Sequence, residues 1–569
     1  MTQPTTSLLS TIWVPPAAAP ADFFADLPSD VSPLIGQLLF NRGLQDRNAV
    51  DAFLSCSYDT LHNPLLLLDM DRAVRRIRDA RERDETIAVY GDFDCDGVTA
   101  TALLIQVFQA LGIRVRPYIP QRIGEGYGLN VRAIELLDQA GIDLLITVDC
   151  GIANVAEVAR ANALGINVIV VDHHTPPNVL PDAYAIINPK QPGCAYPYKG
   201  LSGVGLAFKL IQALHGAGLR TDIRGRDILD LVALGTVSDM VPLDGENRVL
   251  VKHGLRALNG SQRPGICALI DASGLSRPLD ARSIGFDLGP RINAAGRLDD
   301  AALAYELLLA RDLADARERA DDLNRLNIRR QELTKATQAH ALRLIKQQGL
   351  GNDRVIVLDD GDFVPGIVGL VAGRLVDLLG RPVVVLASDG VLAKGSARSV
   401  AEFPIYDAFS RCADLFAKFG GHAQAAGCSL PLANVPLLRQ ALNGLAAQVI
   451  PAPGVVSAPY DTEISLDALT PGFFDELSQL EPFGQSCPLP VWVARGLQVV
   501  EARTMGSDKS HLKLKLRQGR TVHEAVWWGQ AKFAPVLRRA GHSDALFTAE
   551  RKPWQGVPRT QLLVKDIAV

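Results

Sequence analysis

Three short apolar runs, each followed at once by aspartate, constrain the fold of this chain more than any other feature. They are Thr86–Tyr90, Leu144–Val148 and Asn167–Val171. Short continuous runs rich in Val and Ile are typical of parallel strands that are buried on both faces of a sheet. Helical segments such as Ala100–Leu111 and Asn130–Gln139 lie between the runs. The alternation therefore predicts an α/β lobe with a doubly wound parallel sheet.

Acidic side chains gather where these three strands end. The residues that follow the runs, in chain order, are Asp92, Asp94 and Asp96, then Asp149, then Asp172, His173 and His174. A further acidic residue, Asp239, follows the apolar, helical run Ile228–Leu234. In a doubly wound sheet, ligands bind beyond the carboxyl ends of the strands. We therefore expect the functional site at this edge.

Carboxylates at one edge repel one another, and a divalent cation relieves that repulsion. Oxygen ligands with one or two imidazoles suit Mn²⁺ or Mg²⁺ better than Zn²⁺. Two such ions about 3.5–4 Å apart activate a water and stabilise an in-line phosphoryl displacement. Taken alone, a strand-ending aspartate is more often a helix N-cap than a ligand. Capping does not call for so many carboxylates and two histidines at one edge, so the sequence predicts a two-metal site.

The cysteines bear on the kind of metal and on the compartment. Cys95 and Cys150 lie beside the acidic residues, which makes a soft-metal site the alternative, but we expect both to be small buried side chains. The eight cysteines are scattered and form no C-x-x-C pair, which fits a reducing cytosol. Residues 1–24 lack a basic start and are broken by prolines, and no run of about 18 apolar residues occurs. We therefore expect a cytoplasmic protein without a membrane span.

The length of 569 residues indicates several domains. A proline-free helical pattern follows the first lobe and predicts a helix that bridges two lobes. Ile450–Pro459 is rich in Pro and Ala and resembles a linker. The predicted segments are 1–50, whose role the sequence leaves open, the doubly wound lobe at 51–300, the connecting helix at 301–348, a smaller α/β domain at 349–449, and a C-terminal antiparallel β-barrel domain at 455–569.

The C-terminal region is basic in a chain whose net charge is −4. Between Lys509 and Val569 there are 12 Lys and Arg against 4 Asp and Glu. Basic and aromatic residues on a small β domain suit single-stranded nucleic acid, because bases stack on the rings and phosphates pair with the cations. We expect at least two of the four aromatics to lie in the core instead. They are Trp527, Trp528, Phe547 and Trp554, interleaved with Lys513, Lys515, Arg551 and Lys552.

At Asp172-His173-His174 the chain resembles the DHH phosphoesterase superfamily, which is named after that triplet. Further segments resemble the RecJ branch of the superfamily and its associated DHHA1 domain. The matching segments are Tyr90–Gly97, Thr147–Gly151, Asp172–His174, Thr236–Leu243, Ser202–Gly205 with Lys209, Gly289–Arg297 and Gly420–Gly427. The resemblance implies a DHH domain at 51–300, a DHHA1 domain at 349–449 and an OB fold at 455–569.

The resemblance also assigns roles at the acidic edge. It implies that Asp94 and Asp96 bind the two metals, Asp149 bridges them, and His173 and Asp239 complete the ligand set. A water held between the metals would be the nucleophile. The resemblance further places Asp92 and His174 beside the metals in catalytic support, and His422, in a glycine-rich loop, near the scissile phosphate. On sequence alone, a structural role for His422 in its turn is equally compatible.

A pocket for a terminal 5′ phosphate distinguishes the RecJ branch. The matching residues are Arg122, Ser396 and Arg398. Guanidinium groups bind phosphate bidentately, and a hydroxyl adds a further donor. Arg291 and Arg297 fit a strand-guiding role, and the alternative is that they hold the turn around Gly296.

The resemblance implies a 5′-to-3′ exonuclease specific for single-stranded DNA. It would act in DNA repair and recombination, as a monomer, with a RecQ-type helicase and single-strand-binding protein as partners. One alternative is a DHH–DHHA1 phosphodiesterase of small nucleotides or oligonucleotides. Another is a non-catalytic replication scaffold that keeps the fold.

Overall fold

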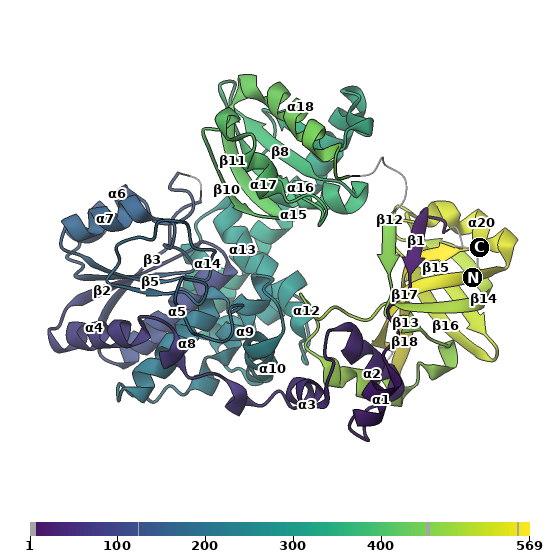
Figure 1. Cartoon of the computed structure of the whole chain (residues 1–569), viewed down its shortest axis with the longest axis horizontal. Helices are drawn as coiled ribbons and strands as arrows, with labels where there is room; N and C mark the ends of the chain where they lie inside the picture. Colours follow the sequence, from purple (N-terminus) through teal and green to yellow (C-terminus); the bar gives the residue numbers. More distant parts are fainter. Residues whose placement is uncertain (1–6, 123, 451–455, 555–556) are drawn as a thin grey trace. The chain divides into compact units, whose positions relative to one another are not determined.

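The computed structural model describes residues 7–122, 124–450, 456–554 and 557–569, with the backbone alone at 456, 552–554 and 557 (Figure 1). The chain forms two compact units. One is Tyr58–Pro453, and the other joins Met1–Ser57 to Gly454–Val569. Among the described residues, no helix is both long and apolar enough to cross a bilayer.

The first lobe of the Tyr58–Pro453 unit is built on a parallel sheet in the order β3-β2-β4-β5-β6. All three predicted strands are present, and the doubly wound sheet is confirmed. The strands are β2 (Thr86–Gly91), β3 (Arg114–Tyr118), β4 (Leu144–Val148), β5 (Asn167–Val171) and β6 (Ala185–Ile187).

Helices cover both faces of this sheet, because successive strand residues point to opposite sides. Ile87 and Val89 of β2 pack with α4, α5 and α8, whereas Ala88 and Tyr90 pack with α6 and α7. This two-sided burial explains why the strands lack the polar alternation of a half-exposed sheet. The helices of the lobe include α4 (Met70–Glu82), α5 (Cys95–Ala110), α6 (Val131–Gln139), α7 (Val155–Ala163), α8 (Gly203–Gly216), α9 (Leu229–Ser238), α10 (Gly245–Gly260), α11 (Pro264–Ala272) and α13 (Gly289–Leu298).

The predicted helix over 301–348 is two helices, so that expectation is corrected. α14 (Ala302–Leu308) ends before Asp312, and α15 (Leu313–Gln347) begins after it. The Asp312 carboxylate accepts hydrogen bonds from the N–H groups of Ala314 and Asp315, which is a helix N-cap. The 35 residues of α15 span about 52 Å at 1.5 Å per residue.

A second lobe follows, built on a mixed sheet in the order β10-β11-β9-β8-β7. Only β7 and β8 run parallel, and the other neighbours are antiparallel. The smaller α/β domain predicted in this region is therefore present. The elements are β7 (Ile356–Asp360), β8 (Val383–Ser388), β9 (Leu392–Arg398), β10 (Lys418–His422), β11 (Ala425–Pro431), α16 (Val368–Leu379), α17 (Ile405–Ser410) and α18 (Val435–Ala446).

The C-terminal strands close into a five-stranded barrel, because β14 pairs with both β15 and β17. Trp527 and Phe547 are buried in its core, as predicted for at least two of the aromatics, while Trp528 is 54% exposed. The side chains of Lys552 and Trp554 lie outside the described residues. The strands are β14 (Trp492–Met505), β15 (His511–Gln518), β16 (Thr521–Trp527), β17 (His542–Trp554) and β18 (Val557–Ala568).

The N-terminal residues belong to the barrel unit. β1 (Thr11–Val14) pairs in parallel with β12 (Val456–Pro459), and the Leu8 N–H donates to the Ile567 carbonyl over 2.8 Å. Phe23 and Ile35, from α1 (Ala21–Asp26) and α2 (Pro33–Asn41), share a core with the barrel. The linker predicted at 450–459 is therefore wrong for its last four residues, which form a strand. Residues 451–455 of that linker lie outside the described part.

Candidate metal centre

The acidic edge forms where β2, β4 and β5 end side by side in the first lobe. The turn after β4 aims Asp149 across this edge with a left-handed backbone, φ 63°. Gly151 follows at φ 110°, where an added Cβ would lie 2.6 Å from the Thr147 hydroxyl. A side chain at Gly151 is therefore excluded by both backbone and space.

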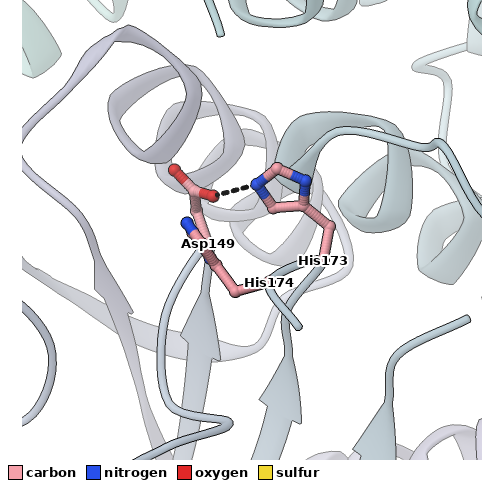
Figure 2. A group of neighbouring side chains, drawn as sticks. All are labelled: Asp149, His173 and His174. Carbon is pink, nitrogen blue, oxygen red and sulfur yellow. Dashed lines mark ion pairs between the residues drawn. The ribbon is translucent and has the colours of Figure 1, made fainter. Parts of the chain in front are cut away.

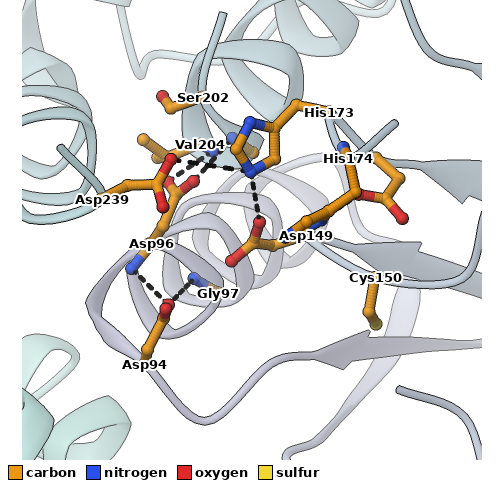
Figure 3. A network of polar contacts seen from close by, with 12 residues as sticks. Asp94, Asp96, Gly97, Asp149, Cys150, His173, His174, Ser202, Val204 and Asp239 are labelled. Atoms are coloured by element: carbon orange, nitrogen blue, oxygen red, sulfur yellow. Dashed lines mark hydrogen bonds and ion pairs between the residues drawn. The ribbon is translucent and has the colours of Figure 1, made fainter. Parts of the chain in front are cut away.

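Asp94 caps a helix and also lies among the carboxylates of this edge. Its Oδ1 accepts hydrogen bonds from the N–H groups of Asp96 at 3.0 Å and Gly97 at 3.2 Å, so it caps α5 (Figure 3). Ligand atoms of Asp94 also lie within 4.8 Å of ligand atoms of Asp92 and Asp149. Capping and metal binding are therefore compatible, because a carboxylate has two oxygens.

α5 begins at Cys95. The Cys95 thiol is buried and faces the Leu234 carbonyl at 3.7 Å. Cys150 is also fully buried. Both are small core side chains, as predicted.

Asp96 is fully buried and faces the N-terminus of α8. Its two oxygens accept hydrogen bonds from the Gly203 N–H at 2.6 Å and the Val204 N–H at 2.8 Å. Burial and the neighbouring Asp94 nevertheless raise the pKa of Asp96 to about 7. The helix N-terminus thus only partly offsets the cost of burying this charge.

His173 lies between two carboxylates. Its Nε2 is 3.0 Å from Asp149 Oδ1 and 3.6 Å from Asp239 Oδ2 (Figures 2 and 3). Burial, followed by the charge of His174, lowers the pKa of His173 to about 3, which leaves the imidazole neutral. A neutral imidazole nitrogen is the form that binds a metal ion.

Some buried ligand atoms at this edge lack hydrogen-bond partners, although both oxygens of Asp96 have one. Four ligand atoms among the described residues are buried and unsatisfied: Asp92 Oδ1, Asp149 Oδ1, His173 Nε2 and Asp239 Oδ2. Burial, reinforced by neighbouring carboxylates, raises the pKa of Asp92, Asp149 and Asp239 well above its usual range. Unsatisfied buried polar atoms are rare and call for a ligand. Divalent cations satisfy all four atoms and reverse the electrostatic cost, so the residues present fit them.

Asp172 orients His174, and sequence reasoning assigned it no role of its own. Asp172 Oδ1 lies 2.7 Å from His174 Nδ1, and Oδ2 accepts from the Ile152 N–H at 3.0 Å. Burial alone would raise the pKa of Asp172, but the charge and hydrogen bond of His174 hold it below its usual range. Its place at the end of a strand, directly before two histidines, could have indicated this role, because a carboxylate there commonly fixes a histidine ring.

His422 reaches the edge from the second lobe. Its ring stacks on His174 with centroids 6.0 Å apart and an interplanar angle of 13°. Lys190, which sequence reasoning missed, donates to the His173 carbonyl at 2.5 Å. The Tyr127 hydroxyl, also missed, lies 3.1 Å from His174 Nδ1. These polar groups surround the side of the edge that faces the second lobe.

Basic side chains gather next to the acidic edge in what we call the arginine cluster: Arg122, Arg297, Arg398 and the adjacent Ser396. Burial and then the charges of Arg122, Arg330 and Arg398 lower the pKa of Arg297 to about 9. Ser396 Oγ and Arg398 Nη2 each lie 3.2 Å from the position a Cβ would take on Gly369, in the first turn of α16. Arg330, on α15, was not predicted.

Close packing of α13 sets the cluster beside the acidic residues. A Cβ on Gly296 would lie 2.4 Å from the Phe93 carbonyl oxygen, so this helix touches the loop between Asp92 and Asp94. Arg297 follows directly, and its Nη1 donates to the Gly366 carbonyl at 3.3 Å. Arg291 is engaged elsewhere. It donates to Asn324 Oδ1 at 3.0 Å and to the Asp287 carbonyl at 2.8 Å.

Three stretches of the chain match known domain families. The DHH family, N-terminal domain, matches residues 86–236, and the DHHA1 domain matches residues 352–448. The RecJ OB domain matches residues 460–566. The three matches cover both lobes and the barrel.

Proteins of known name resemble the chain over most of its length. The single-stranded-DNA-specific exonuclease RecJ of Bacillus subtilis is 36% identical over 543 residues, which are 95% of this chain and 68% of that protein. The protein of the same name from Escherichia coli is 36% identical over 87% of this chain and 88% of its own length. The crystal structure of RecJ with Mn²⁺ from Thermus thermophilus matches with a TM-score of 0.84 and 31% identity, over 98% of this chain and 79% of that one. A Mg²⁺ complex from the same organism matches with a TM-score of 0.78.

Proposed function

This chain belongs to the RecJ family of the DHH phosphoesterase superfamily, and we propose that its acidic edge and arginine cluster together degrade single-stranded DNA from the 5′ end. It is a metal-dependent exonuclease, a hydrolase of phosphodiester bonds. The observation that carries the proposal is the set of four unsatisfied ligand atoms at the acidic edge, next to a cluster of closely spaced arginines.

Within this proposal the acidic edge holds two divalent cations, Mn²⁺ or Mg²⁺. Asp94 and Asp96 would each hold one, Asp149 would be shared between them, and His173 and Asp239 would complete the set. Bound there, the cations activate a water as nucleophile and offset the charge that develops on the phosphate. The chain supplies rigid positions for these ligands, because strand ends and the first turn of α5 fix Asp94, Asp96 and Asp149.

The neighbouring side chains hold and orient the substrate. His174, fixed by Asp172, and His422 stack at the open side of the edge, where they donate to the scissile phosphate. Asp92 supports the ligand set from the floor of the edge. Lys190 adds a positive charge beside His173. None of these groups needs to move for the reaction.

The arginine cluster sets the polarity of degradation. Arg122, Arg398 and Ser396 bind the terminal 5′ phosphate, and Arg297 guides the strand toward the acidic edge. A terminal phosphate carries more charge than an internal diester, so a cluster of guanidinium groups prefers it. Arg291 is held by Asn324 of α15 and does not bind the strand directly in this proposal. Its positive charge adds to burial in lowering the pKa of the neighbouring Arg330.

The setting follows from the family. We propose a role in DNA repair and recombination, with a RecQ-type helicase and single-strand-binding protein as partners, for a cytoplasmic monomer. All eight cysteines are free, which supports a reducing compartment. The RecJ OB match over 460–566 favours long strands over small nucleotides as substrate. The complete set of carboxylates and histidines at the edge speaks against a non-catalytic scaffold.

A time course with defined ends tests this function. Strands labelled at the 3′ end and carrying a 5′ phosphate are incubated with the protein and Mn²⁺, or with EDTA, beside a blunt duplex. We expect stepwise shortening of the single strand from its 5′ end with Mn²⁺ only, and an intact duplex. Cleavage of dinucleotides with the long strand intact would instead place the protein among the small-substrate phosphodiesterases. No cleavage of either would support the scaffold.

A further inference from the structure

A cavity of about 1000 Å³ lies in the first lobe, away from the acidic edge. It is bounded by the last turns of α5 and α10, the first residues of α9, and the segment that follows α14. α5 and α9 each place a candidate metal ligand at the opposite end, Asp96 and Asp239. At 1.5 Å per residue, the 10 residues of α9 separate the cavity from Asp239 by about 15 Å. The cavity is therefore distinct from the acidic edge.

The cavity is positively charged. Its charged lining residues are four arginines, Arg226, Arg256, Arg263 and Arg311, and two aspartates, Asp227 and Asp230. Four positive and two negative charges leave a net charge of +2, in a chain whose net charge is −4. Such an excess attracts an anionic ligand.

The cations differ in how far the protein itself neutralises them. Arg263 is engaged, since its Nε lies 3.2 Å from Asp230 and its Nη1 donates to Gln106 at 2.9 Å. Arg226 faces only the exposed Asp227, at 3.8 Å. In the described part of the chain, no acidic side chain pairs with Arg256 or Arg311. Both project from exposed positions at the cavity rim and are available to an anion.

The floor of the cavity is formed by a buried group, while its mouth is open to solvent. Asp230 is 3% exposed and accepts a hydrogen bond from the Ser261 hydroxyl at 2.9 Å, which fixes the floor. Tyr305, Leu309 and Pro264 supply an aromatic and apolar wall, and Gln109 adds an amide. A flat apolar ring can pack against such a wall, and an amide can form hydrogen bonds with the polar edge of that ring. Arginines bind phosphate.

We propose that this cavity binds a nucleotide, with the phosphate on Arg256 and Arg311 and the base against Tyr305. The volume favours this ligand, because pockets of 300–1000 Å³ are typical for small molecules. The lining favours it as well, because it combines cations with an aromatic wall. The site is additional to the proposed exonuclease function and does not depend on it.

Photo-cross-linking tests the proposal independently of catalysis. The full-length protein in EDTA is irradiated with 2-azido-dAMP, and adducts are located by mass spectrometry. We expect adducts on residues 253–263 and 305–311. The R256E/R311E variant should lower their yield at least tenfold, while Arg398→Ala leaves it unchanged. The R81E/R160E variant, which makes the same change of charge on α4 and α7, is the matched control.

Three results would overturn the proposal. The first is an unchanged yield in R256E/R311E, and the second is labelling confined to the arginine cluster. The third is displacement of the label by a single-stranded oligonucleotide or a polyglutamate peptide at lower concentration than by dAMP. That result would assign the cavity to a strand path or to an acidic protein. Exonuclease activity and melting temperature of R256E/R311E, both expected at wild-type level, establish that the variant is folded.

Discussion

The acidic edge and the arginine cluster are neighbours of opposite charge, and they are assembled in different ways. The edge collects its carboxylates from successive strand ends of one sheet and one adjoining helix. The cluster draws Arg122, Arg297 and Arg398 from three segments, on both lobes. The two regions compensate each other only in part: burial keeps the pKa of Asp92 well above its usual range, although Arg122 favours the charged form of this carboxyl. The difference teaches that the ends of one sheet bring carboxylates together by topology, whereas cations from two lobes are brought together only by tertiary packing.

Removing the central carboxylate should have the largest effect. Asp149→Ala deletes the carboxylate that lies 3.0 Å from His173 Nε2, and even a partner of a metal ligand is worth about 10–100-fold in activity. We therefore expect Mn²⁺-dependent exonuclease activity to fall by more than a hundredfold, measured as the initial rate on a phosphorylated single strand. Asp138→Ala, at an exposed position on α6, is the control. Wild-type activity of Asp149→Ala would exclude the bridging role.

The uncompensated charge of the edge should also appear in stability. Binding at a hundredfold excess over Kd stabilises a protein by about 2.7 kcal/mol, so Mn²⁺ should raise the melting temperature. Asp149→Asn keeps the shape but removes one repelling charge. It should melt at or above the wild-type temperature in EDTA and gain less from Mn²⁺. If Asp149→Asn instead melted lower than wild type in EDTA, repulsion at the edge would be refuted.

On the other side of the comparison, Arg398→Ala tests the cluster. A hydrogen bond to a charged group contributes about 1.5–3 kcal/mol, which corresponds to roughly tenfold to a hundredfold. We expect a loss of this size on 5′-phosphorylated strands and little change on strands with a 5′ hydroxyl. Arg411→Ala, at the exposed end of α17, is the control. Equal losses of activity on phosphorylated and unphosphorylated strands would show that Arg398 does not bind the terminal phosphate.

The smallest effect should come from the neutral member of the cluster. Ser396→Ala removes a hydroxyl, and a neutral hydrogen bond contributes about 0.5–1.5 kcal/mol. The preference for a 5′ phosphate, measured as the ratio of rates on the two ends, should fall only a few-fold. A loss as large as that of Arg398→Ala would mean that Ser396 positions the arginine rather than the phosphate.

The acidic edge was predictable from sequence because chain topology alone brings it together. Parallel strands end at one edge, so Asp92, Asp149 and His173 must meet there once the strands are recognised. The partner of His174 was not assigned, since only coordinates show that Asp172 turns toward that ring. The helix cap at Asp312 was also missed, because helical periodicity continues on both sides of it.

The arginine cluster could not be derived from periodicity. Arg122 and Arg398 are separated by more than two hundred residues and lie on different lobes, so only the family resemblance linked them. Arg330, in the middle of a polar helix, gave no signal at all. The packing of the N-terminal segment against the barrel could not be predicted for a similar reason. Its apolar residues, such as Phe23 and Ile35, indicate a core but not which core, and their partners come from the other end of the sequence.

That pairing of early and late residues has a consequence for how the protein is made. Residues 58–453 are synthesised before residues 454–569, so both lobes can begin to fold during translation. The segment that carries Phe23 waits for its partner strands while about 500 residues are added, or roughly 25–100 s at 5–20 residues per second. During this interval its apolar side chains have no barrel to pack on. In the nascent chain the two lobes with the nuclease site are therefore complete before the barrel is. The exposed N-terminal segment is the natural place for a chaperone to act.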